Sequence, residues 1–217
     1  MLGKLFDRQP AEKTTSVTPA LSGPRIPRHS GGWAMLRKQL AAEPGLRVLD
    51  IGSTSPTNIN FLTELGHSVY MADIVDDVVS GDWKRGEDED GKAIWDGEGF
   101  VQQNLTFSGR QFDIVLLWTT LDYLPEGLLA PVIAALHAAM VPKGQMLALF
   151  HTKLVPDQSP YYRFHITAAD EVQMQLARPA TQQRALTNRN IEKLFTEWSS
   201  LKQFLAKDGV SEAIIVR

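Results

Sequence analysis

Short apolar segments alternate with segments of helical spacing along most of this chain, and several apolar segments end at a polar or small residue. The segments that we interpret as strands are 47–51, 68–73, 100–104, 112–118 and 145–150. Apolar strands that alternate with helices are typical of a parallel sheet that is covered by helices on both faces. The pattern therefore predicts an α/β fold with five parallel strands in a doubly wound sheet.

Two further strands are expected near the end of the chain, at 200–206 and 212–217, on either side of a turn at Gly209. A parallel connection needs about a dozen residues or more, which this turn does not provide. We therefore expect a C-terminal antiparallel strand pair. Helices are expected at 33–42, 56–65, 127–140 and 190–198, the first two capped by Ser30 and Ser55.

The N-terminal part of the chain is rich in proline, glycine and hydroxyl residues, mainly over 7–31. This composition disfavours a helix and favours an extended or mobile segment. We interpret residues 1–29 as a flexible N-terminal arm and 30–217 as a single domain. Within that domain, residues 151–187 interrupt the final part of the fold, either as a lid over a substrate or as a packing insertion.

Charge and composition exclude several classes of protein. The net charge is −3 and acidic residues gather in 76–98, which is unlike the basic surface of a nucleic-acid-binding protein. No apolar run is long enough to span a membrane and the N-terminus lacks a signal-peptide pattern, so we expect a cytoplasmic protein. The chain has no cysteine, which excludes disulfides and thiolate metal sites. Its five histidines are scattered, so we expect no metal site.

The end of the first predicted strand, together with the loop after it, has the composition of a ligand-binding turn. It reads VLDIGSTSPTN over 48–58, so that the small residue Gly52 is followed by hydroxyl side chains at Ser53 and Thr54. The start of the next helix can hold an anionic group such as a carboxylate, and Asp50 can accept a hydrogen bond from an amine or hydroxyl. The alternative is that Gly52 only makes a tight turn and Asp50 only binds loop amides.

Asp73 ends the second predicted strand and lies 21 residues beyond Gly52. Because the carboxyl ends of parallel strands meet at one edge of a sheet, we expect the two residues to lie near each other. At this spacing one carboxylate can accept both hydroxyls of a ribose while the first loop holds the rest of a nucleoside. The alternative is that Asp73 only caps a helix.

Five segments follow one another in a recognisable order: VLDIG, VYMAD, FVQQNL, FDIVLLWTTLDYLPE and MVPKGQMLALF. In this order and spacing, residues 47–150 resemble the core of class I S-adenosylmethionine (SAM)-dependent methyltransferases. The segments in 186–217 look like the last helix and antiparallel strand pair of that fold, and the chain is similar to small bacterial methyltransferase-like proteins. The resemblance implies a Rossmann-like sheet, SAM as the cofactor and methyl transfer by in-line displacement.

The resemblance also implies which residues bind the cofactor: Asp50, Gly52, Ser53, Thr54, Asp73, Asn104, Leu105, Trp118 and Thr119. Asp50 and Gly52 would line the methionine end of SAM. Asp73 would hold the ribose hydroxyls, and Asn104 would bond the adenine amino group with Leu105 beside the ring. Trp118 and Thr119 follow the fourth strand, where the family places methionine contacts and groups that face the substrate.

Methyl transfer depends largely on alignment and desolvation, and it needs no metal. A hydroxyl or amine acceptor can require a base. Candidate bases at the carboxyl edge are Asp122, Tyr123 and His151, and Tyr161, Tyr162 and His165 lie in the segment that follows.

We weigh three functional hypotheses. The first is a SAM-dependent methyltransferase that acts on an unidentified small molecule. The second is a catalytically silent binding or scaffolding protein of the same fold, because the family's second and third loop glycines are replaced here by Thr54 and Pro56. The third, a nicotinamide-dependent oxidoreductase, would need a fuller glycine fingerprint and the Tyr-x-x-x-Lys pair of the short-chain class, and both are absent.

Overall fold

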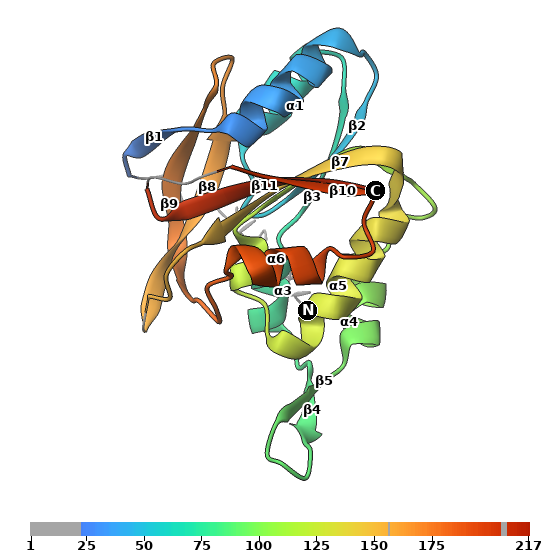
Figure 1. The fold of residues 1–217 in the computed structure, drawn as a ribbon, viewed down its shortest axis with the longest axis vertical. Helices are drawn as coiled ribbons and strands as arrows, with labels where there is room; N and C mark the ends of the chain where they lie inside the picture. The colour runs from blue at the N-terminus through green and yellow to red at the C-terminus, as the bar shows by residue number, and fades with distance from the viewer. Residues whose placement is uncertain (1–22, 156, 205–207) are drawn as a thin grey trace, which may run out of the picture.

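The computed structural model describes residues 23–155, 157–204 and 208–217. Its centre is a six-stranded sheet in the order β10-β11-β7-β6-β2-β3 (Figure 1). The bounds of these strands are β2 Arg47–Ile51, β3 Ser68–Ala72, β6 Phe112–Trp118, β7 Met140–His151, β10 Ser200–Phe204 and β11 Val210–Val216. Strands β3, β2, β6 and β7 are parallel, whereas β11 runs antiparallel to both β7 and β10. The predicted α/β fold and the terminal antiparallel pair are therefore confirmed.

Helices cover both faces of this sheet, as a doubly wound sheet requires. Their bounds are α1 Gly31–Ala42, α2 Pro56–Glu64, α3 Ile74–Ser80, α4 Gly97–Asn104, α5 Glu126–Ala139 and α6 Asn188–Leu194, with a short 3₁₀ turn η1 at Thr120–Asp122. Alternate residues of β6 enter the two apolar cores: Ile114 and Leu116 pack with α1 and α2, whereas Val115 and Leu117 pack with α4, α5 and α6. Burial on both faces explains why the strand sequence is apolar throughout.

The predicted helix starts are confirmed by their caps. Ser30 accepts a hydrogen bond from Trp33 N (3.0 Å), and Ser55 accepts one from Asn58 N (3.2 Å). Pro56 occupies the first turn of α2, where its missing N–H costs nothing. Gly66 has φ +85° just after α2, a conformation that favours glycine and ends the helix.

The predicted strand at 100–104 is wrong, so the sheet has four parallel strands rather than five. These residues belong to helix α4, which begins where Asp96 accepts a hydrogen bond from Gly99 N (2.8 Å). The fully buried ring of Phe100 packs edge-on against Trp83, with 5.1 Å between ring centroids. The cap at Asp96 and the buried contact of Phe100 favour a helix. In addition, the segment has too few apolar residues to fill a strand that is buried on both faces.

The middle of the acidic segment, residues 84–95, forms a small hairpin beside the main sheet, whereas its two ends belong to α3 and α4. Strands β4 Lys84–Glu87 and β5 Ala93–Trp95 are antiparallel, and in Figure 1 they project away from the rest of the molecule. Most of the hairpin's residues are exposed. Exposure allows these carboxylates to remain solvated.

A second sheet lies beside the first, in the order β1-β9-β8 (Figure 1). Its strands are β1 Arg25–His29, β8 Gln158–Ile166 and β9 Glu171–Thr181. Part of the expected flexible arm is therefore an extended strand paired with β9, and 1–22 lie outside the described residues. Arg28 anchors β1 by donating to Glu212 and to Asp208 Oδ2 (2.7 Å). The division into arm, domain and insertion stays a prediction.

Candidate functional site

The carboxyl ends of β2, β3, β6 and β7 meet at one edge of the central sheet, which we call the carboxyl edge. Gly52 follows β2 and its amide donates to Ala72 O at the end of β3 (2.8 Å). Trp118 ends β6 and His151 ends β7. The ends of parallel strands are the usual ligand-binding place in such sheets, so the side chains at this edge form the candidate site.

Asp50 is a buried carboxylate whose two oxygens both bind protein groups. Trp118 Nε1 donates to Oδ1 (2.6 Å) and Asn58 Nδ2 donates to Oδ2 (2.9 Å). Burial raises the pKa of Asp50 from 3.8 to about 6, although these two hydrogen bonds oppose the rise. In this conformation Asp50 ties the end of β2 to β6 and α2.

Gly52 is required for the close approach of an aromatic ring. A Cβ at this position would lie 2.9 Å from Cδ1 of Trp118, which is closer than real Cβ contacts allow. Trp118 itself has φ +48° and stacks on Phe164 of β8, with ring centroids 4.9 Å apart and planes within 4°. The Trp118 ring, rather than open space, therefore covers the glycine.

The hydroxyl residues of the first loop contact β8 of the second sheet. Arg163 donates to Ser53 Oγ (3.1 Å) and to the carbonyl of Thr54. Asn58 joins the same surfaces, because its Oδ1 accepts from Ile166 N (2.8 Å) and its Nδ2 donates to Phe164 O (3.0 Å). Arg163 and Asn58 are not among the predicted site residues, since no local pattern links the two segments.

Asp73 lies at the carboxyl edge as expected, and side chains of β8 and β9 engage its carboxylate. Arg178 Nη1 lies 3.1 Å from Oδ2, Arg178 Nη2 lies 3.5 Å from Oδ1, and the Tyr161 hydroxyl donates to Oδ1 at 3.5 Å. The Arg178 guanidinium also lies over the Tyr161 ring, 4.7 Å from its centroid. Asp73 additionally caps α3 by accepting from Asp76 N (3.4 Å), so the capping alternative is part of its role.

Asp122 and His151 form a hydrogen-bonded pair at the other end of the carboxyl edge. The Asp122 Oδ2 atom lies 2.8 Å from His151 Nδ1 and accepts from the His151 backbone amide at 2.7 Å. Asp122 is fully buried, and burial raises its pKa against the opposing hydrogen bonds from His151. The His151 side chain is 14% exposed, so the ring is within reach of a bound molecule.

Tyr123 connects this pair to the Asp73 end of the site. Its ring meets His151 and Tyr161 edge-on, with centroids 5.9 Å and 4.9 Å away. Its hydroxyl donates to Pro160 O (3.0 Å), and burial raises its pKa. Tyr123 is therefore suited to remain a protonated donor. The structure thus brings together the three predicted catalytic residues.

Two other residues of the 151–187 segment have different surroundings. His165 is buried with both ring nitrogens engaged, Nδ1 2.8 Å from Ser55 Oγ and Nε2 3.0 Å from Gln175 Oε1. Burial also lowers the pKa of His165. With no ring nitrogen left for a substrate, His165 links the first loop to β9. Tyr162 is only partly buried and packs beside the α1–α2 core.

The remaining predicted cofactor residues lie at α4 and η1. Asn104 ends α4 and donates to Phe100 O (3.0 Å), while Leu105 is buried in the core beside α4. Neither residue has a hydrogen bond to Gly52 or Asp73 among the contacts of the described chain. Thr119 lies at the end of β6, and its buried hydroxyl has no partner within the described part of the chain. The binding roles of these residues stay predictions.

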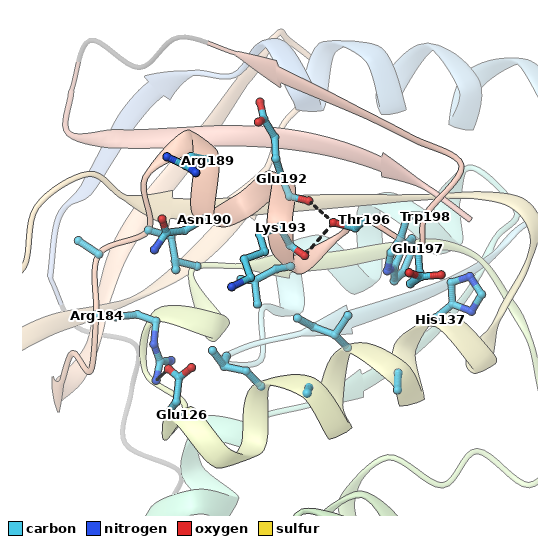
Figure 2. Close-up of a pocket in the computed structure, with 17 residues that line it drawn as sticks. Glu126, His137, Arg184, Arg189, Asn190, Glu192, Lys193, Thr196, Glu197 and Trp198 are labelled. Carbon is cyan, nitrogen blue, oxygen red and sulfur yellow. Dashed lines mark hydrogen bonds and ion pairs between the residues drawn. The ribbon is translucent and has the colours of Figure 1, made fainter.

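Two cavities of the structure lie away from the carboxyl edge. A groove of about 1330 Å³ runs between α5 and α6, with Leu129, Ile133 and Trp198 among its apolar lining and Arg184 and Lys193 among its charged residues (Figure 2). A second cavity of about 390 Å³ lies between α4 and α5. Neither cavity includes Gly52, Asp73 or His151.

Within 23–155, 157–204 and 208–217, no group of three or more His, Cys, Asp or Glu side chains could hold a metal ion. In the same ranges, every helix is too short or too polar to cross a membrane.

A family model described as a methyltransferase domain matches residues 28–206. Among solved structures, a SAM-dependent methyltransferase from Archaeoglobus fulgidus has a TM-score of 0.50 at 11% identity, covering 85% of this chain and 92% of that one. TehB from Haemophilus influenzae has a TM-score of 0.48 at 11% identity, covering 86% of this chain. This chain spans 62% of the length of TehB. The search of curated proteins found no match.

Proposed function

We propose, from the premise that this chain belongs to the methyltransferase domain family, that it transfers a methyl group from SAM to a small-molecule acceptor. The observation that carries the proposal is the position of the Gly52 loop and the Asp73 carboxylate at the ends of adjacent parallel strands, paired along β2 and β3. In sheets of this kind that edge holds the nucleoside part of a cofactor.

The residues at the carboxyl edge have the chemistry that SAM requires. Asp73 offers two carboxylate oxygens to the ribose hydroxyls, and Gly52 presents backbone without a side chain. The N-terminal turn of α2 favours an anionic group such as the methionine carboxylate. The donors and acceptors at this edge therefore match those that SAM needs. In the present conformation, however, Arg178 binds Asp73 and Arg163 binds Ser53, so side chains of β8 and β9 occupy the positions that the cofactor would take.

Bound SAM supplies a methyl group on a positively charged sulfur, and the protein must align an acceptor with it and remove the acceptor's proton. We assign the proton transfer to His151. If Nδ1–H donates to Asp122, Nε2 keeps its lone pair and can accept a proton from a hydroxyl or amine. Asp122 is buried and does not reach a substrate itself, so it is a positioning residue that fixes the ring of His151.

Calorimetry with S-adenosylhomocysteine (SAH) tests the cofactor site. The parent chain should bind SAH, and Asp73→Ala should weaken binding by about tenfold or more because the ribose loses its acceptors. Asp82→Ala is the matched control, since it removes an exposed carboxylate that follows α3. Absence of SAH binding at millimolar concentration, both by the parent and by a variant in which Asp73 is freed from Arg178, would refute the proposal.

Turnover tests the assignment of His151. In a screen of hydroxyl and amine acceptors read out by SAH release, His151→Gln should retain SAH binding and lose most of the rate. An unchanged rate and pH profile in His151→Gln would contradict its role as a base. If the parent binds SAH and methylates nothing in the screen, the catalytically silent alternative replaces methyl transfer.

A further inference from the structure

Side chains of the β8–β9 hairpin lie on the same groups that the proposed function gives to the cofactor. We call Tyr161, Arg163 and Arg178 the hairpin plug. We propose that this plug is a displaceable occupant of the nucleoside site, with Arg178 in the place of the ribose hydroxyls, so that SAM binds only when the plug withdraws. The proposal rests on the proposed function and adds regulation to that same site.

The Asp73 carboxylate already binds side chains of the hairpin. Its Oδ2 faces Arg178 Nη1 (3.1 Å), and its Oδ1 is shared by Arg178 Nη2, the Tyr161 hydroxyl and the amide of Asp76. A carboxylate has about four acceptor positions, two on each oxygen; Oδ1 faces three protein donors and Oδ2 faces one, so at most one position on Oδ2 remains for a ligand. Two ribose hydroxyls cannot bind this carboxylate unless Arg178 and Tyr161 give up their contacts.

Side chains also fill the space above the first loop. Measured from the position of a Cβ on Gly52, the nearest atoms are Cδ1 of Trp118 at 2.9 Å and the Tyr161 hydroxyl at 3.7 Å. Arg163 reaches across the same loop to Ser53 and Thr54. A cofactor chain can lie over Gly52 only if the Trp118 ring, which stacks on Phe164 of β8, moves together with Tyr161 and Arg163.

The two ends of the β8–β9 hairpin are held differently. At the turn end, Ile166 and Val172 are buried in the α1–α2 core, and Trp33 Nε1 donates to Thr167 O (3.0 Å) and Ala169 O (3.1 Å). The open end carries Arg178 and Tyr161, which are paired across the strands. The open end is held by the Tyr123 hydroxyl, which donates to Pro160 O (3.0 Å), and by the Asp122 carbonyl, which accepts from Gln183 N (2.7 Å). Its withdrawal must break these contacts while the turn end stays fixed.

A local irregularity separates these ends. The β8–β9 register shifts between Tyr161 and Tyr162, and such bulges bend a strand and redirect its side chains. Arg178 and Asp73 are 27% and 21% exposed at their side chains, so water can reach their ion pair. Asp76 Oδ1 lies 3.4 Å from Arg178 Nη2 and offers the guanidinium a second partner when Asp73 is taken by a ligand. Withdrawal of Arg178 therefore does not leave its charge unpaired.

Calorimetry with SAH and arginine variants tests the plug. Arg178→Ala should bind SAH about tenfold more tightly than the parent, because the competing contact is gone. Arg178→Lys should fall between them, since lysine keeps the charge but not the two-pronged contact. Arg85→Ala is the matched control, because it removes an arginine from Asp96 (2.6 Å) at the start of α4 and should leave affinity unchanged.

The outcomes separate this inference from the proposed function. Equal or weaker SAH binding by Arg178→Ala, with binding by the parent, would overturn the plug and leave the methyltransferase site standing. SAH binding by Arg178→Ala but not by the parent would support both. If the parent and Arg178→Ala both fail to bind while their thermal unfolding shows folded protein, the cofactor site itself is refuted, and the plug with it.

Discussion

Replacing Asp50 by asparagine should remove a large part of the pH dependence of stability. The folded protein holds the pKa of Asp50 at about 6, above its ordinary value of 3.8, because the carboxyl group is buried without a cation. The folded state therefore binds this proton more tightly than the unfolded state does. The favourable contribution is complete below about pH 4 and is lost as the pH rises through about 6.

The rise from 3.8 to about 6 in the pKa of Asp50 corresponds to about 3 kcal/mol of unfolding free energy. Asparagine stays neutral at every pH, so the variant lacks this loss. Urea unfolding followed by tryptophan fluorescence, between about pH 4 and pH 7.5, would measure this loss. It is the difference in slope between the parent and Asp50→Asn when the free energy of unfolding is plotted against pH. The same titration of Asp82→Asn, which removes one exposed negative charge, controls for net charge. Parallel curves for the parent and Asp50→Asn would refute the reasoning.

Three further substitutions test the packing of the site and its support by urea unfolding. Gly52→Ala should cost about 1–3 kcal/mol, because the new methyl group meets Trp118 at 2.9 Å; an unchanged midpoint would contradict this. Trp118→Phe removes a donor to Asp50 and should cost about 1.5–3 kcal/mol, and a pH dependence like that of the parent would argue against the bond. Arg28→Met leaves Glu212 buried without its cation and should cost about 3–5 kcal/mol, part of which Glu212→Gln in the same chain should restore.

Much of the fold could be predicted because its signals are local. The apolar run 112–118 is long enough to cross a buried sheet, and Ser30 and Ser55 mark helix starts through single side chains. The segment 100–104 misled because its helical identity depends on a cap at Asp96 and on the contact of Phe100 with Trp83. Asp96 and Trp83 both lie outside the segment 100–104.

The positions of the site residues followed from the rule that parallel strands end at one edge, which brought the Gly52 loop, Asp73 and His151 to that edge. Their partners could not be predicted in the same way. Arg178 reaches Asp73 across 105 residues of sequence, and nothing in the 151–187 segment indicates which arginine faces the first loop. Long-range pairs of this kind depend on the tertiary docking of β8 and β9, which the local pattern does not encode.

A crystal structure of the chain with SAH would test the central claim most directly. The account predicts that the adenosine lies across the Gly52 loop with its ribose hydroxyls on Asp73, and that Arg178 has moved off the Asp73 oxygens, from which it now lies 3.1 and 3.5 Å away. SAH bound elsewhere, for example in the groove between α5 and α6, with the Arg178–Asp73 pair intact, would contradict it.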